Sequence, residues 1–144
     1  MIVLDASVAI KLVFPEQHSD RALALLNATI QAGDTVLAPP LLPFEVANAI
    51  RQRMIRQGLA LPRADQIMTR FLAFAIILTA PAGLYNQAIA LADAHNLPAA
   101  YDAHYVALAQ SESCELWTDD QRLIRTVGGS LSFVRPIATY PIPS

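Results

Sequence analysis

Short apolar runs alternate along the chain with longer segments in which apolar residues recur at helical spacing. The first run, Ile2 to Leu4, has two β-branched residues and ends at Asp5, as in a strand that a parallel sheet buries on both faces. We expect five such strands, the last at a sheet edge because it ends in a proline. The predicted strands cover residues 2–4, 34–38, 76–79, 115–118 and 133–136.

Helices are predicted between these strands, and proline or glycine residues mark many of their ends. Gly33 and Gly58 each follow a helical segment at the position where helices commonly stop. The predicted helices cover residues 6–14, 16–32, 42–57, 62–75, 81–95, 99–111 and 119–127. This alternation predicts a single α/β domain over residues 1–144, built as a three-layer α/β/α sandwich around a central, mainly parallel sheet.

The composition is typical of a folded intracellular protein. Of the 144 residues, 54% are hydrophobic and 15% are charged, which allows a sizeable core and argues against disorder. The single cysteine, Cys114, permits no internal disulfide and is expected in the core. The first residues lack a basic segment and carry Asp5 within their apolar part, so we predict no secretory signal and a cytoplasmic location.

One uncharged stretch, residues 71–92, is long enough to span a bilayer. Pro81, Gly83, Asn86 and Gln87 interrupt it, so a strand followed by a buried helix explains it better. This stretch also has little polar surface. We expect a homodimer that buries apolar helix surface here, and the alternative is that the stretch lies entirely in the core.

The charge of the chain bears on nucleic-acid binding in two opposite ways. Its net charge is −2, whereas nucleic-acid binders usually carry a basic surface. Its positive side chains are Lys11 and nine arginines, and arginine is well suited to paired recognition of phosphate or carboxylate. Five of the arginines lie between residues 51 and 70. They either bind a phosphate backbone or only solvate helix faces.

Acidic side chains follow two of the predicted strands directly. Asp5 comes after the first strand, and Asp119 and Asp120 come after the fourth. The carboxyl ends of parallel strands share one edge of the sheet, and ligands bind outside that edge. Each of these acids can alternatively serve only as the N-cap of the next helix.

Two further acids lie near the starts of predicted helices. Glu45 is in the first turns of the helix after the second strand, with Asn48 one turn later on the same face. Asp102 lies near the start of the predicted helix 99–111. Either residue can alternatively be a solvated or capping acid that the helix dipole favours.

These acids predict a divalent cation if the fold brings them together. Crowded carboxylates raise one another's pKa, and a cation removes that cost. Ligands that are all oxygen suit Mg²⁺ or Mn²⁺ rather than zinc. His18, His95 and His104 show no spacing typical of metal ligands and are expected at the surface or in the core.

Four segments together resemble a PIN domain and, more narrowly, the VapC toxins of VapBC toxin–antitoxin pairs. They are LDASV at 4–8, LPFEVANA at 42–49, YDAHYVALA at 101–109 and LWTDDQRL at 116–123. The similarity runs from Met1 to about Pro136. It implies a PIN-like fold, a ribonuclease that depends on Mg²⁺ with Mn²⁺ as a substitute, and a homodimer. It also implies a VapB-like antitoxin, in a groove near Glu45 and residues 51–70.

The resemblance also implies roles for individual residues. The four catalytic acids are Asp5, Glu45, Asp102 and Asp120, and three of them, Asp5, Asp102 and Asp120, are metal ligands. A Thr-x-Asp pattern selects Asp120 over its neighbour as the fourth acid. Ser7, Asn48, Thr118 and Asp119 are the supporting polar residues.

Two rival functions follow from the same residues. A hydrolase that forms an aspartyl phosphate requires a second aspartate two residues after the first, where this chain has Ser7. A PIN-like module that only binds protein would have no need for the full set of acids, which repel one another without a metal.

Overall fold

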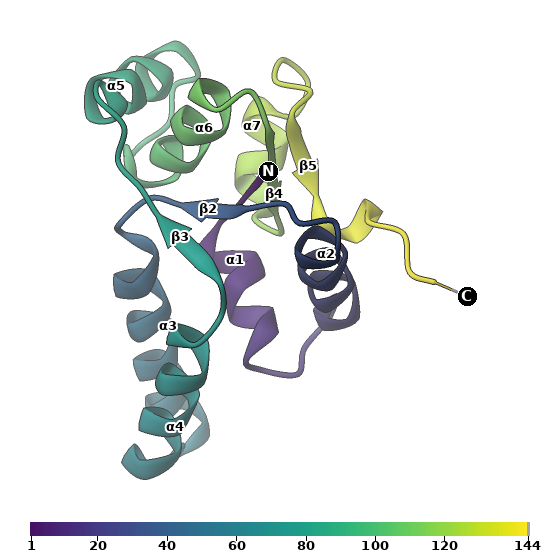
Figure 1. Cartoon of the computed structure of the whole chain (residues 1–144). Helices are drawn as coiled ribbons and strands as arrows, with labels where there is room; N and C mark the ends of the chain where they lie inside the picture. Colours follow the sequence, from purple (N-terminus) through teal and green to yellow (C-terminus); the bar gives the residue numbers. More distant parts are fainter. Residues whose placement is uncertain (144) are drawn as a thin grey trace.

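Five short parallel strands form the centre of the molecule in the computed structural model, which describes residues 1–143 (Figure 1). Their order is β3-β2-β1-β4-β5, and each neighbouring pair is parallel. The strands are β1 (Ile2–Leu4), β2 (Val36–Ala38), β3 (Ile76–Leu78), β4 (Glu115–Thr118) and β5 (Val134–Pro136). Each predicted strand is present, and β5 lies at an edge as its proline indicated.

The helices also lie where the sequence pattern predicts them. They are α1 (Ala6–Ala9), α2 (Ser19–Gln31), α3 (Leu42–Gln57), α4 (Leu61–Leu72), α5 (Leu84–Ala94), α6 (Tyr101–Ser111) and α7 (Gln121–Val127). Two 3₁₀ turns, η1 (Ile10–Leu12) and η2 (Ile137–Thr139), complete the described elements. Helix α3 ends at Gly58, which has a left-handed φ of 67°.

The predicted helix 42–57 keeps its bounds and the other predicted helices are shorter in the structure, two of them for an identifiable local reason. The segment 6–14 begins as α1 and tightens into η1 before Pro15, a residue that cannot continue a helix. The segment 81–95 becomes helical only at Leu84, because Gly83 before it has a φ of 83° that belongs to a turn.

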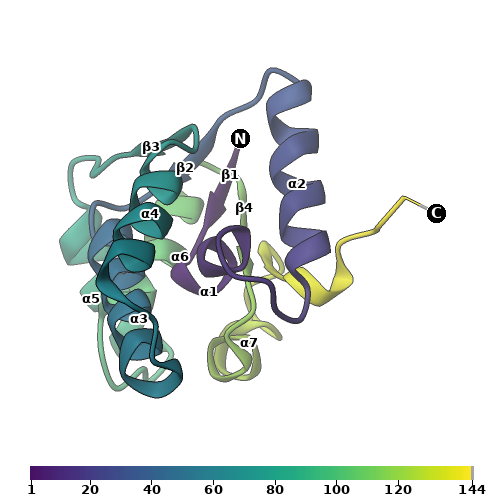
Figure 2. The same cartoon turned by 90° about the horizontal axis from the view of Figure 1, so that it is seen from below.

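Helices cover both faces of the sheet (Figure 1, Figure 2). Each face has its own apolar cluster. Val3 and Leu37 belong to the larger cluster, together with buried side chains of α5 and α6. Leu4 and Val36, which alternate with them along the strands, pack with α1 and α2 in the second cluster. The predicted three-layer α/β/α sandwich is therefore confirmed.

Three of the connections place Asp5, Glu45 and Asp120 on segments that leave the same edge of the sheet. From the carboxyl ends of their strands, β1 leads into α1, β2 leads into α3 and β4 leads into α7. Helices α3 and α4 pack against each other and extend away from the sheet as a pair (Figure 2).

The uncharged stretch 71–92 contributes to the surface as well as to the core. It forms the end of α4, the edge strand β3 and most of α5. Ile77 is 54% exposed, and Leu72, Leu78 and Ile89 are exposed too. Among the described residues, no helix combines the length and the apolar character that crossing a membrane requires.

Candidate active site

Asp5 is a buried carboxylate at the end of β1, with a side chain only 4% exposed. It is the N-cap of α1, because its Oδ1 accepts a hydrogen bond from the Val8 amide at 3.2 Å. The Ser7 hydroxyl donates to the same oxygen at 2.5 Å, and the Thr118 hydroxyl donates to Oδ2. The capping interpretation and the site interpretation of Asp5 are therefore compatible.

Burial raises the pKa of Asp5 from 3.8 to about 7. The hydrogen bonds from Ser7, Thr118 and Val8 act against this rise, whereas the charge of Asp102 adds to it. The ionised form of Asp5 is therefore costly in the absence of a cation.

Two hydroxyl groups connect Asp5 to the loop after β4. Ser7 Oγ accepts a hydrogen bond from the Asp119 amide at 2.8 Å, and Thr118 Oγ1 accepts one from the Asp120 amide at 3.0 Å. Each hydroxyl also donates to the Asp5 carboxylate. The ends of β1 and β4 are thus held together through one buried carboxylate.

Asp120 caps the helix that follows β4. Its Oδ1 accepts hydrogen bonds from the amides of Arg122 at 2.9 Å and Leu123 at 3.1 Å. Its charge reaches Asp102, a half-buried acid of α6. Burial raises the pKa of Asp102, the charge of Asp120 raises it further and Arg122 lowers it. The fold therefore brings Asp102 and Asp120 into electrostatic contact, with Arg122 beside them.

Glu45 is held by a tyrosine that sequence reasoning missed. The hydroxyl of Tyr105, on α6, donates to Glu45 Oε1 at 2.7 Å. Burial raises the pKa of Glu45, the bond from Tyr105 opposes this and Asp102 adds to it. Tyr105 lies three residues after Asp102 on the same helix, and this spacing is the signal that would have pointed to it.

Asp119 is in a different environment from the other acids. Its Oδ2 forms an ion pair with buried Lys11 at 2.9 Å, and Lys11 also binds Glu16 at 3.0 Å. Arg53 in turn pairs with Glu16. Burial would lower the pKa of Lys11, but its two acidic partners outweigh this and raise it. The charge of Asp119 is therefore compensated, although its Oδ1 is buried without a hydrogen-bond partner in residues 1–143.

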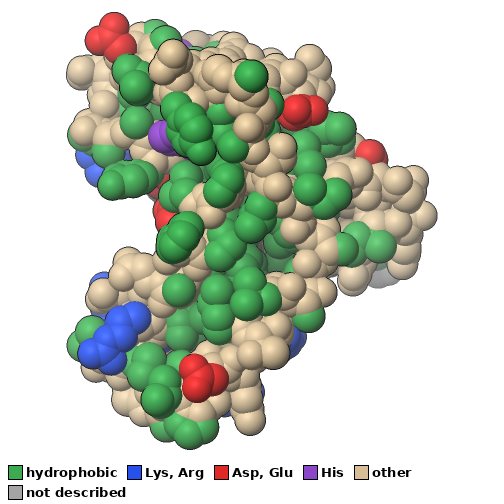
Figure 3. Space-filling model, turned by 60° about the vertical axis from the view of Figure 1, so that its left-hand side comes forward, with side chains coloured by type: hydrophobic (Ala, Val, Ile, Leu, Met, Phe, Trp, Pro, Cys, Tyr) green, Lys and Arg blue, Asp and Glu red, His purple; other side chains and the backbone are tan. Residues whose placement is uncertain are grey.

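A groove opens beside these acids. Its volume is about 730 Å³, and its polar lining consists of Ser7, Glu45, Asn48 and Asp102. The rest of the lining is apolar. Figure 3 shows a deep recess on the face that carries much of the exposed apolar surface, with acidic side chains inside it. An adjoining cavity of about 410 Å³ has Arg53 and Arg56 in its lining.

The donor chemistry of this site fits a hard divalent cation such as Mg²⁺. Asp5, Glu45, Asp102 and Asp120 offer only oxygen, and three of them have pKa values raised by burial. In the part of the chain that the structure describes, no three acidic, histidine or cysteine side chains are already grouped closely enough to hold an ion. The acids would therefore have to close around a cation on binding.

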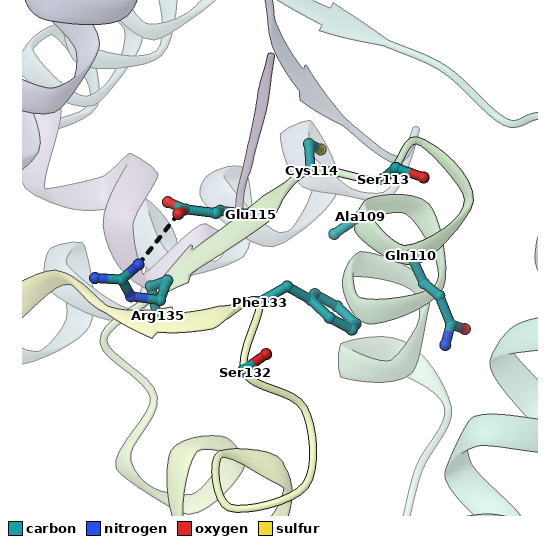
Figure 4. Close-up of a pocket in the computed structure, with 8 residues that line it drawn as sticks. All are labelled: Ala109, Gln110, Ser113, Cys114, Glu115, Ser132, Phe133 and Arg135. Carbon is teal, nitrogen blue, oxygen red and sulfur yellow. Dashed lines mark hydrogen bonds and ion pairs between the residues drawn. The ribbon is translucent and has the colours of Figure 1, made fainter.

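A separate cavity lies at the opposite end of β4 and contains none of the predicted site residues. Its volume is about 490 Å³, and an ion pair between Glu115 and Arg135 lies along its lining (Figure 4). Cys114, predicted in the core, is half-buried there against the larger apolar cluster. Burial raises the pKa of its thiol, which argues against a reactive cysteine.

The chain is similar to known proteins over nearly its whole length. The family model for the PIN domain matches residues 2–129. Ribonuclease VapC12 of Mycobacterium tuberculosis is 31% identical over 128 residues, which are 89% of this chain and 93% of that protein. Ribonuclease VapC9 of the same organism is 29% identical over 126 residues, 88% of this chain and 91% of that protein.

The fold also matches a solved structure. The crystal structure of PAE2754 from Pyrobaculum aerophilum aligns with a TM-score of 0.67 and 21% identity, covering 96% of this chain and 91% of that one. At this level of identity the match supports the fold alone.

Stability of the metal-free chain should fall as the pH rises towards neutrality. The pKa of Asp5 is 3.8 ordinarily and about 7 in the folded chain, so protonated Asp5 favours folding below about pH 4. That contribution, on the order of 4 kcal/mol, is lost as the pH rises through about 7. Urea unfolding in a chelator at pH 4.5 to 7.5 measures it.

The variant Asp5→Asn cannot ionise at this position and should show a clearly shallower decline over that range. Some decline should remain, because the pKa values of Glu45 and Asp102 are raised as well. An equally steep decline in Asp5→Asn and the unmodified chain would contradict the assignment.

Proposed function

The chain belongs to the PIN domain family and is a relative of the VapC ribonucleases, and we propose that it hydrolyses RNA phosphodiester bonds with the help of Mg²⁺. It would act as the toxic component of a type II toxin–antitoxin system in the cytoplasm, with residues 1–144 as one domain. One observation carries the proposal. Burial raises the pKa of Asp5, Glu45 and Asp102, which come from three different segments of the chain, and the charge of Asp102 raises the pKa of the other two further.

Asp5, Asp102 and Asp120 are the residues that would hold Mg²⁺, with Mn²⁺ as a substitute. The bound cation supplies stabilisation of the charge that develops on the phosphate and lowers the pKa of water. Ser7 and Thr118 orient the Asp5 carboxylate, and Asp120 is kept in place by the helix it caps.

Glu45 is the residue that would orient the attacking water. Tyr105 occupies its Oε1, and its Oε2 remains to accept a hydrogen bond from water. A raised pKa makes Glu45 a better proton acceptor near neutral pH. Direct binding of the cation by Glu45 is the alternative role.

The two rival functions have less support. A hydrolase that forms an aspartyl phosphate on Asp5 would need a second carboxylate two residues later, and that position is Ser7, whose hydroxyl donates to Asp5 Oδ1. A module that only binds protein would keep one buried and two half-buried carboxylates, Asp5, Glu45 and Asp102, with no cation to compensate their repulsion.

The groove beside the acids also suits an antitoxin. Its apolar lining with acids at one side fits a segment that places apolar side chains in the groove and a basic side chain at the carboxylates. A cation from the partner would then take the place of the metal.

A homodimer is the assembly that the exposed apolar surface favours. Leu72, Ile77, Leu78 and Ile89 are exposed at the end of α4, on β3 and on α5. Figure 3 shows apolar side chains spread over this face. Large apolar patches mark interfaces, and two-fold dimers are the commonest soluble assembly.

Replacement of the buried acid should abolish cleavage. Asp5→Asn keeps a helix-capping side chain, so the fold should survive, but loss of the negative charge should reduce Mg²⁺-dependent RNA cleavage by more than about a hundredfold. The exposed Asp65 on α4 provides the control, since Asp65→Asn should cleave at the unmodified rate. Retention of the full rate by folded Asp5→Asn would refute the proposed site.

Asp120 should matter more for cleavage than Asp119. Lys11 already compensates Asp119, so Asp119→Asn should mainly lower stability and leave cleavage within a few-fold. Asp120→Asn retains the cap of α7 but should lose roughly ten- to a hundredfold at saturating Mg²⁺. A larger loss in Asp119→Asn would reverse the assignment.

Light scattering should give a mass near twice the 15.6 kDa of the chain at micromolar concentration. Ile89→Lys, on α5, should shift the mass towards that of the monomer. Ile30→Lys changes an exposed isoleucine on α2 and should leave the dimer intact. A monomer at all concentrations, or dissociation by Ile30→Lys alone, would rule out this interface.

A further inference from the structure

Several aromatic side chains gather around a small cavity next to the acidic groove. The cavity has a volume of about 310 Å³. Phe44 from the start of α3, Tyr101 from the start of α6 and Tyr85 from α5 line it, together with His104. Pro39 and Pro40, which follow β2, complete the wall.

These rings are far more exposed than aromatic side chains usually are. Phe44 is 78% exposed, Tyr101 is 69% exposed and Tyr85 is 60% exposed. They therefore contribute little to the core of the isolated chain, although burying a ring is favourable. The Tyr85 and His104 rings meet edge to face at 5.7 Å, which restrains the orientation of both. An exposed aromatic cluster of this kind is typical of a binding surface.

The aromatic cavity is continuous with the groove that contains the acids. Leu41, Phe44 and Tyr101 line both. Phe44 immediately precedes Glu45, and Tyr101 immediately precedes Asp102. Both rings line the groove together with Glu45 and Asp102, so a flat ligand held by the rings would lie beside acids of the proposed catalytic site.

The lining of the cavity distinguishes between parts of an RNA strand. Among its described lining residues there is no lysine or arginine, so a phosphate would find no compensating charge. The Nδ1 of His104 is engaged with the Ala100 carbonyl at 2.6 Å. Neutral aromatic faces instead suit the π-face of a nucleobase, which stacks on such rings irrespective of its identity.

We propose that this aromatic cavity is a stacking subsite for one nucleobase of single-stranded RNA, next to the scissile phosphate. The proposal rests on the ribonuclease function proposed above and adds a substrate-binding site to it. It also accounts for RNA binding by a chain with a net charge of −2, because stacking adds affinity that does not depend on positive charge.

The subsite is tested by combining protein variants with RNAs that each lack one base. Binding of a short single-stranded RNA is measured in a chelator, which prevents cleavage, together with copies in which each nucleotide in turn is abasic. For the unmodified chain, one abasic position should weaken binding by roughly tenfold or more, as expected for the loss of one stacked base. Tyr101→Leu should weaken binding of the intact RNA by a similar factor. This variant should bind the intact RNA and the RNA with that abasic position with the same affinity.

The matched control keeps the ring. Tyr101→Phe should bind as the unmodified chain does and should stay sensitive to the same abasic position. With Mg²⁺ present, Tyr101→Leu should raise KM while kcat stays within a few-fold, because the acids remain. Phe44→Leu should behave in the same way as Tyr101→Leu.

The possible failures are distinguishable. If the unmodified chain cleaves RNA but Tyr101→Leu retains its affinity and its abasic sensitivity, only the subsite is wrong. If Tyr101→Leu instead loses binding of an antitoxin and not of RNA, the cavity belongs to the protein partner and the subsite is again wrong. If the unmodified chain neither binds nor cleaves RNA, the proposed function itself fails.

Discussion

The buried carboxylate of Asp5 is the constraint on which the site depends. It must be placed at the end of β1 in a region with little access to water, and its burial raises its pKa to about 7. The fold meets part of this cost with three hydrogen-bond donors. The hydroxyls of Ser7 and Thr118 also accept hydrogen bonds from the amides of Asp119 and Asp120. The Asp5 carboxylate therefore also holds the loop that carries Asp120.

Much of the fold could be predicted from the sequence because its signals are local. A parallel sheet buried on both faces leaves short apolar runs, and Gly58 marks the end of α3 through its own backbone conformation. The acids Asp5 and Asp120 are visible for a similar reason. Asp5 directly follows β1 and Asp120 comes two residues after the end of β4, in places where a helix needs a cap and where a sheet presents its carboxyl edge.

The partners of the acids could not be predicted in the same way, because they depend on contacts between distant segments. Tyr105 meets Glu45 across 60 positions of sequence, and Lys11 meets Asp119 although 108 positions separate them in the chain. The Thr-x-Asp pattern selected Asp120 over Asp119 without a physical reason. In the structure the two acids differ in their surroundings, since Asp119 is compensated by Lys11 whereas the charge of Asp120 acts on Asp102, and this difference supports the proposed choice of Asp120.

Two of the acids of the proposed catalytic site, Asp5 and Asp120, are also helix caps, and capping and burial act on Asp5 in opposite directions. The N-terminus of α1 carries partial positive charge, which favours the ionised form of its capping acid Asp5. Burial acts in the opposite direction and prevents Asp5 from being fully ionised near neutral pH without a cation. Asp5 and Asp120 are therefore held in place by the helices they cap, and binding of a cation to the proposed site would stabilise the folded chain.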